Sequence, residues 1–132
     1  MVIGIGMGGA HAGTFLQVVG VVMILALLPM ALWPLQWARV VGWKIPADNH
    51  LAIYYGRCLG AVASATGAFA IVASAHAATT AFYFPFLLTL WVLMVLAHAW
   101  GGLRRIQPLS ETCEIVFWGG LAVLTLAFWP IA

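Results

Sequence analysis

Charged residues are the scarcest class in this chain of 132 residues. Lys and Arg together number five, Asp and Glu number three, and charged residues make up 6% of the sequence. A soluble globular domain carries about 25% charged residues, so this composition excludes an ordinary soluble fold. Five basic residues are also too few to neutralise the several phosphates that a nucleic-acid-binding surface contacts, so nucleic acid is not an expected partner.

Cysteine and the common catalytic motifs are equally sparse. Cys58 and Cys113 stand alone without a CxxC pair, so we expect neither disulfides nor a zinc site and interpret both as small apolar residues. The chain has no GxSxG, no HExxH and no glycine-rich phosphate loop followed by Lys and Ser or Thr, which leaves hydrolysis and phosphoryl transfer without support. The start lacks the basic residues and short apolar core of a secretory signal, so we expect mature protein from residue 1.

Most of the chain consists of long apolar runs. Hydrophobic residues make up 65% of the chain, and the mean hydropathy is +1.10. Four apolar stretches each approach the roughly 20 residues that cross a bilayer core. We therefore predict an all-α membrane protein, a bundle of four transmembrane helices in one domain over 1–132. The predicted helices cover about 14–37, 51–75, 82–103 and 111–130, with a bend where Pro29 and Pro34 interrupt the first helix.

The few basic residues predict the orientation. They all fall in, or one turn from, the two loops that follow the first and third predicted helices: Arg39, Lys44, Arg57, Arg104 and Arg105. Basic loops face the cytoplasm in membrane proteins. We therefore expect both termini on the outer, periplasmic side of a bacterial-type inner membrane. At the start of the fourth helix, we expect Ser110 and Glu111 to supply a cap and an early negative charge.

A strip of small residues runs along the second predicted helix. Gly56, Gly60 and Ser64 recur at every fourth position, and Gly67 continues a neighbouring strip. In lipid, helices associate largely through close backbone approach at such strips. We expect this face to pack against at least two other helices or chains.

Three ionisable residues are predicted to lie at similar depth. Counting about 1.5 Å per residue along each helix, Arg57, His98 and Glu114 come out just below the cytoplasmic interface. They would then form a site in which an Arg–Glu pair is completed by a His able to relay a proton or bind a quinone carbonyl. The alternative is a purely structural Arg57–Glu114 pair that fixes how the fourth helix docks on the second.

Three of the four histidines, His11, His76 and His98, have Ala on both sides. Small neighbours leave room for a macrocycle ligated by the imidazole, which makes His98 a candidate ligand for haem or a chlorophyll-type pigment. The segment Ala97-His98-Ala99-Trp100 resembles the chlorophyll-ligating segment of bacterial light-harvesting polypeptides. Those polypeptides have a single transmembrane helix, so their function is not carried over. His11 and His76 are expected together at the outer face, as a metal or haem site, or as interfacial residues bonded to water or backbone.

The predicted function follows from how little polar chemistry the helices carry. Transporters usually show broken helices and polar groups at mid-membrane, and these helices are apolar there. We expect an accessory or structural subunit of a larger membrane complex, energy-transducing or oxidoreductase, without catalytic activity of its own. Its partners would be the lipid bilayer and other transmembrane subunits or further copies of itself. The alternative is a small membrane enzyme or redox protein that binds a hydrophobic substrate, quinone or haem at Arg57, His98 and Glu114.

Overall fold

The computed structural model describes residues 9–130. Within that range all the regular secondary structure is helical, with five helices and no strand. The helices are α1 (Gly9–Leu32), α2 (Pro34–Val40), α3 (His50–Ala73), α4 (Ala77–Arg104) and α5 (Leu109–Ala127). All but the short α2 are long and apolar enough to cross a membrane. The predicted all-helical architecture with four long apolar helices is therefore confirmed.

The predicted first helix is divided in two by Trp33. This residue leaves the helical region with φ −132° and ψ 63°, and α2 begins at Pro34. Proline disfavours the helical conformation in the residue before it, which explains the break. Pro29 lies inside α1 without ending it, and its carbonyl oxygen accepts a bond from the Trp33 amide at 2.8 Å. The break therefore follows from Pro34.

The connection between α3 and α4 is shorter than expected. We predicted a turn over 76–80, whereas α4 already begins at Ala77. The hydroxyls of Thr79 and Thr80 donate to the Ala73 carbonyl oxygen at 2.7 and 3.0 Å, so the first turn of α4 satisfies the end of α3. At the other end of the chain α5 stops at Ala127 rather than at residue 130.

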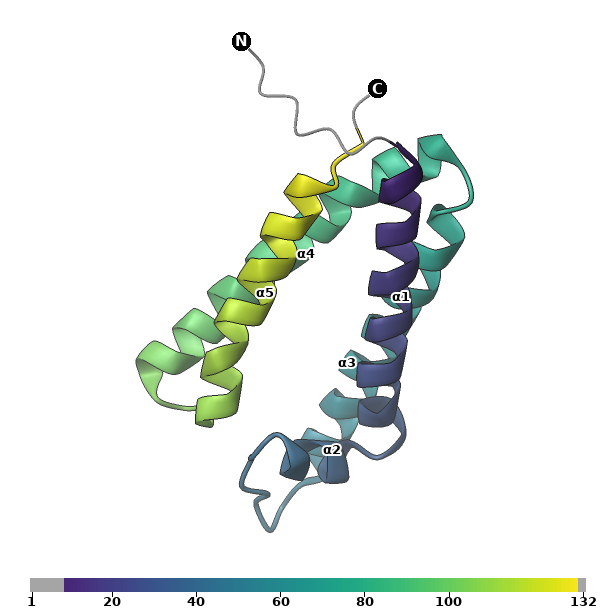
Figure 1. Ribbon diagram of the computed structural model, residues 1–132. Coiled ribbons are helices and arrows are strands. Elements are labelled where there is room, and N and C mark those ends of the chain that lie inside the picture. Colours follow the sequence, from purple (N-terminus) through teal and green to yellow (C-terminus); the bar gives the residue numbers. More distant parts are fainter. Residues whose placement is uncertain (1–8, 131–132) are drawn as a thin grey trace.

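The four long helices form two hairpins, α1 with α3 and α4 with α5 (Figure 1). The hairpins meet near the start of α1 and the end of α5 and diverge away from it (Figure 1). Aromatic rings join them at the meeting point, where Phe15 lies 5.2 Å from Phe128 and 5.7 Å from Phe84 between ring centroids. The opposite end carries α2, the α2–α3 and α4–α5 connections and the adjoining helix turns, where the basic residues lie, and we refer to it as the basic end.

The first hairpin is held by direct backbone contact. A Cβ atom added at Gly67 would lie 2.7 Å from the Gly20 carbonyl oxygen, and one added at Gly60 would overlap the Ala31 amide nitrogen. Gly56 faces α2, where an added Cβ would lie 2.7 Å from the Pro34 Cβ. The glycines of α3 thus lie against two helices, α1 and α2. Ser64, half-buried, donates its hydroxyl to the Gly60 carbonyl oxygen of its own helix at 2.7 Å.

The second hairpin is held by large side chains with polar atoms. Trp91 of α4 is fully buried, stacks on Trp118 of α5 at 5.4 Å between ring centroids, and donates its indole N–H to the Thr125 hydroxyl at 3.0 Å. Thr125 is also fully buried and donates in turn to the Leu121 carbonyl oxygen. A chain of aromatic and hydroxyl groups therefore runs along the α4–α5 interface and leads to His98 at the basic end.

Candidate functional site

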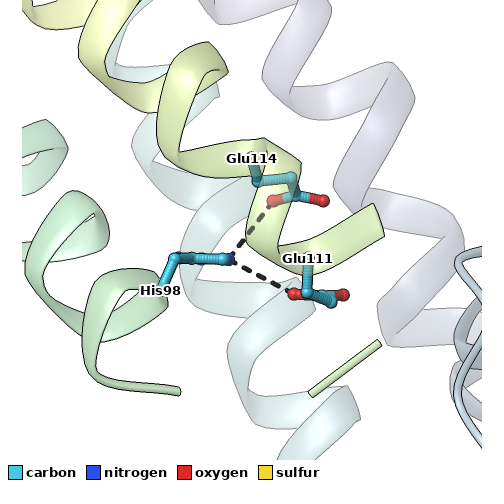
Figure 2. A group of neighbouring side chains, drawn as sticks. All are labelled: His98, Glu111 and Glu114. Atoms are coloured by element: carbon cyan, nitrogen blue, oxygen red, sulfur yellow. Dashed lines mark ion pairs between the residues drawn. The ribbon is translucent and has the colours of Figure 1, made fainter. Parts of the chain in front are cut away.

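The site is centred on His98, which α4 presents toward α5. The His98 side chain is only 9% exposed. Its Nδ1 lies 2.8 Å from the carbonyl oxygen of Met94, one turn earlier on the same helix. A carbonyl oxygen can only accept, so Nδ1 carries the hydrogen and the ring orientation is fixed. The second nitrogen, Nε2, is directed at the first turns of α5 (Figure 2).

Two carboxylates of α5 face this nitrogen. Glu111 and Glu114 are three residues apart, a spacing that places both side chains on one face of a helix. His98 Nε2 lies 3.2 Å from Glu111 Oε2 and 3.4 Å from Glu114 Oε2 (Figure 2). The Glu111 side chain is 12% exposed and the Glu114 side chain 29% exposed, so all three groups are largely withdrawn from the surroundings.

Two indole N–H groups orient the carboxylates. Trp118 Nε1 donates to Glu114 Oε2 at 3.0 Å, from one turn further along α5. Trp43 Nε1 donates to Glu111 Oε1 at 2.9 Å, from the connection between α2 and α3. The same connection turns at Gly42, with φ 92°, and its Val41 carbonyl oxygen accepts the Ser110 hydroxyl. A loop of the first hairpin therefore completes a site built by the second.

The loop between α4 and α5 is fastened directly beside the site. Gln107 donates its side-chain amide to the His98 carbonyl oxygen at 2.9 Å and to the Thr112 hydroxyl at 3.1 Å. Gly101 makes this possible, because a Cβ there would overlap the Gln107 side-chain oxygen. These bonds set the spacing between the end of α4 and the start of α5, and hence the distance from His98 to the two glutamates.

The arrangement brings acceptor atoms together. With Nδ1–H bonded to Met94, a neutral His98 presents a lone pair at Nε2, and each ionised carboxylate presents only acceptors. Such a group needs a cation among its members, either a proton or a metal ion. Within the described residues, His98, Glu111 and Glu114 form the group of three with metal-ligating atoms, all within 4.8 Å of one another. The site is therefore suited to proton transfer or to metal binding.

The structure brings together two of the three residues predicted to meet here. His98 and Glu114 are in contact, whereas Arg57 is exposed on α3 and forms no ion pair within residues 9–130. The expected contact of Arg57 with Glu114 is therefore wrong. No Cα atom of α3 lies within 8 Å of one of α5 in the described chain, because α3 packs on α1 while α5 packs on α4. Counting residues along each helix predicts a similar depth in the membrane for the three side chains, but it does not predict which helices lie next to each other.

Glu111 is the member of the site that the sequence interpretation missed. The expected cap at Ser110 is wrong, because Pro108 occupies the N-cap position and Ser110 bonds to Val41. Glu111 lies in the first turn of α5, as expected for an early negative charge, and in addition pairs with His98. The spacing of Glu111 and Glu114 was the available signal, since it predicts two carboxylates on one helical face.

The other predicted ligands lie away from this cluster. His11 near the start of α1 and His76 at the N-cap of α4 are both exposed, near the end where the hairpins meet. Haem or pigment ligation by His98 would need open space in front of Nε2. Here that nitrogen faces two carboxylates at 3.2 and 3.4 Å, so a macrocycle would have to displace α5.

Comparisons of the chain with protein-family models, with curated proteins and with solved structures give no match.

Proposed function

We propose that this chain is a multi-pass protein of a bacterial-type inner membrane that acts as an accessory subunit of a larger membrane complex. Four helices of sufficient length and hydropathy support the multi-pass placement. The basic loops gather at the end opposite the start of α1, which supports an orientation with both termini outside. A reporter fused at Ala132 should report the periplasm, and a cytoplasmic signal would reverse this orientation.

The observation that carries the subunit proposal is an open pair of glycines on α5. A Cβ added at Gly119 or Gly120 would meet no atom within 4 Å, in contrast to the tightly covered glycines of α3. On the neighbouring turns Val116 and Val123 are 79% and 65% exposed. Glycine gives lipid little apolar surface, whereas it allows another transmembrane helix to approach the backbone closely. The face of α5 that carries these two glycines therefore fits a partner helix.

Native cysteines provide the test. Cys113 is exposed on α5, and Cys58 is exposed on α3. In membranes treated with a thiol crosslinker, we expect Cys113 to join the chain to another membrane protein. A Cys113→Ser variant, which retains only Cys58, should form much less of this product. Gly120→Leu should abolish the Cys113 product, whereas Gly120→Ala should retain it.

Equal crosslinking from both cysteines, or a product that survives Gly120→Leu, would remove α5 as the subunit interface. Two differently tagged copies of the chain, expressed together, distinguish self-association from a different partner. If the crosslinked product carries both tags, the partner is a second copy of this chain.

The second candidate function is a small membrane enzyme or redox protein. The close contact of His98 with Glu111 and Glu114 favours it, because three ionisable groups at 3.2 and 3.4 Å can pass a proton among themselves. An absorbance spectrum and a quinone extraction of the purified protein test it. A haem or pigment band, or bound quinone, that disappears in His98→Ala would favour this candidate over the subunit proposal.

A further inference from the structure

We propose that His98, Glu111 and Glu114 bind a divalent transition-metal ion, with His98 Nε2 and one oxygen of each carboxylate as ligands. This inference goes beyond the subunit role and does not depend on it. The three residues come from two helices that are fixed relative to each other by Gln107 and by the stacking of Trp91 on Trp118. The ligand positions are thus set by packed structure rather than by mobile side chains.

The histidine has the orientation of a metal ligand. In metal sites the ring nitrogen that does not bind the ion usually donates its hydrogen to a carboxylate or a backbone carbonyl, which fixes the tautomer. His98 Nδ1 lies 2.8 Å from the Met94 carbonyl oxygen, in this arrangement. Nε2 is consequently the nitrogen whose lone pair faces the glutamates.

The separations between ligand atoms also match a coordination sphere. Ligands about 2.1 Å from a zinc-like ion lie about 3.4 Å apart in a tetrahedron and about 3.0 Å apart at right angles. The distances from His98 Nε2 are 3.2 Å to Glu111 Oε2 and 3.4 Å to Glu114 Oε2. Both separations from Nε2 thus match a shared coordination sphere, and the ligating atoms of the three residues all lie within 4.8 Å of one another.

Charge favours a divalent ion over a proton. Two ionised carboxylates contribute a charge of −2, and a proton on His98 offsets half of it. A divalent ion offsets all of it while His98 stays neutral. Because unbalanced charge is costly where water is scarce, and these side chains are 9%, 12% and 29% exposed, the neutral combination is the more stable one.

Two tryptophans supply the outer contacts that such sites use. Trp43 bonds to Oε1 of Glu111 and leaves Oε2 directed at the ion. Trp118 donates to Oε2 of Glu114, the same oxygen that faces His98 Nε2, and so holds that carboxylate in place. One imidazole and two carboxylates suit zinc, manganese or ferrous iron better than a soft metal. Three protein ligands also leave at least one coordination position for water or a substrate. Glu114, the most exposed of the three, marks the side from which that position is reached.

The test uses the full chain purified in detergent, stripped with a chelator and dialysed against Zn²⁺ or Co²⁺ alone. We expect one retained ion per chain by elemental analysis and a visible Co²⁺ absorption band typical of nitrogen and oxygen ligands. Glu111→Gln and His98→Ala should each weaken binding at least tenfold, since loss of even an outer contact costs about 10- to 100-fold. Trp43→Phe should weaken it about tenfold for the same reason.

The matched control is the exposed pair of His50 and Asp48, whose Nε2 and Oδ1 are 3.3 Å apart with side chains 83% and 82% exposed. His50→Ala should leave ion content unchanged. Circular dichroism shows whether each variant is folded. If His98→Ala does not fold, the test relies on Glu111→Gln instead. Wild-type protein that retains no ion would overturn the proposal in favour of a proton-sharing cluster. Ion binding that survives in folded Glu111→Gln, or that is lost in His50→Ala, would also overturn it, because the ion would then be held elsewhere.

Discussion

The two hairpins solve the same packing problem by different means. In α1–α3, glycine removes the side chains so that backbones touch, and the contact is made of van der Waals packing. In α4–α5, indole, hydroxyl, imidazole and carboxylate groups fill the interface and are paired with one another. Among the described residues, the side-chain hydrogen bonds of the first hairpin, such as that from Gln17 to Ser74 at 3.3 Å, involve no ionisable group. The interface of the second hairpin, in contrast, contains His98 and two glutamates.

The largest expected effect comes from filling the glycine contact of the first hairpin. In Gly60→Leu the new side chain would overlap the backbone of α1 at Ala31 and Leu27, which cannot move aside as a flexible side chain would. Overpacking typically costs about 1–3 kcal/mol, and a backbone obstacle should put the cost at the upper end or above. Thermal unfolding in detergent measures it. The control is Gly120→Leu on open α5, which should leave unfolding of the isolated chain nearly unchanged.

The second hairpin should be most sensitive at His98. His98→Ala leaves Glu111 and Glu114 facing each other, whereas Glu114→Gln retains the His98–Glu111 pair and an amide oxygen for Trp118. Stranding a fully buried charge costs about 3–5 kcal/mol, and the partial exposure here reduces this to about 1–3 kcal/mol. In metal-free protein, His98→Ala should therefore have a lower unfolding temperature than Glu114→Gln. The opposite order would mean that His98 does not hold the two carboxylates together.

A smaller loss of stability is expected when the contact between the two hairpins is removed. Trp43→Phe removes the indole N–H that Glu111 accepts, at a cost of about 1 kcal/mol. Trp37→Phe is a matched control, because Trp37 donates a bond of the same 2.9 Å length to Ala26, inside the first hairpin. Both variants should lose similar stability. Spin labels on α3 and α5 should show a changed distance between hairpins for Trp43→Phe alone, and equal changes would remove the bridging role of Trp43.

The smallest effect is expected at Arg57. Its side chain is exposed and has no ion pair among residues 9–130, so Arg57→Gln should change the free energy of unfolding by less than about 0.5 kcal/mol. A parallel measurement with His98→Ala shows whether the assay resolves an effect of the size expected at the site. A loss of stability in Arg57→Gln comparable to that of His98→Ala would mean that Arg57 does interact with the site.

Composition and spacing sufficed for the architecture and for the face of α3 that packs. Four apolar runs predicted the four long helices. The spacing of Gly56, Gly60 and Ser64, with Gly67 on a neighbouring strip, predicted a packing face, and the three glycines lie against α1 and α2 while Ser64 bonds within its own helix. Both features depend on local sequence, since hydropathy acts residue by residue and helical spacing fixes which residues share a face.

The site was only half accessible from sequence, because it depends on which helices become neighbours. Depth along each helix correctly related His98 to Glu114 and incorrectly added Arg57. Nothing in the local sequence predicts that α5 packs on α4 alone. Nor does it predict that Trp43 bonds to Glu111, which follows 68 positions later. Such contacts are set by the docking of the two hairpins rather than by any single segment.

The short connection between the hairpins bears on the order in which the protein is assembled during translation. All the close glycine contacts of α1, α2 and α3 involve residues synthesised before α4 begins, so the first hairpin can pack while the second is still in the ribosome. The acidic residues of α5 emerge last. Trp43 and Val41, which bond to Glu111 and Ser110, are synthesised well before them. The first hairpin thus contributes groups that bond to the start of the last helix to be synthesised.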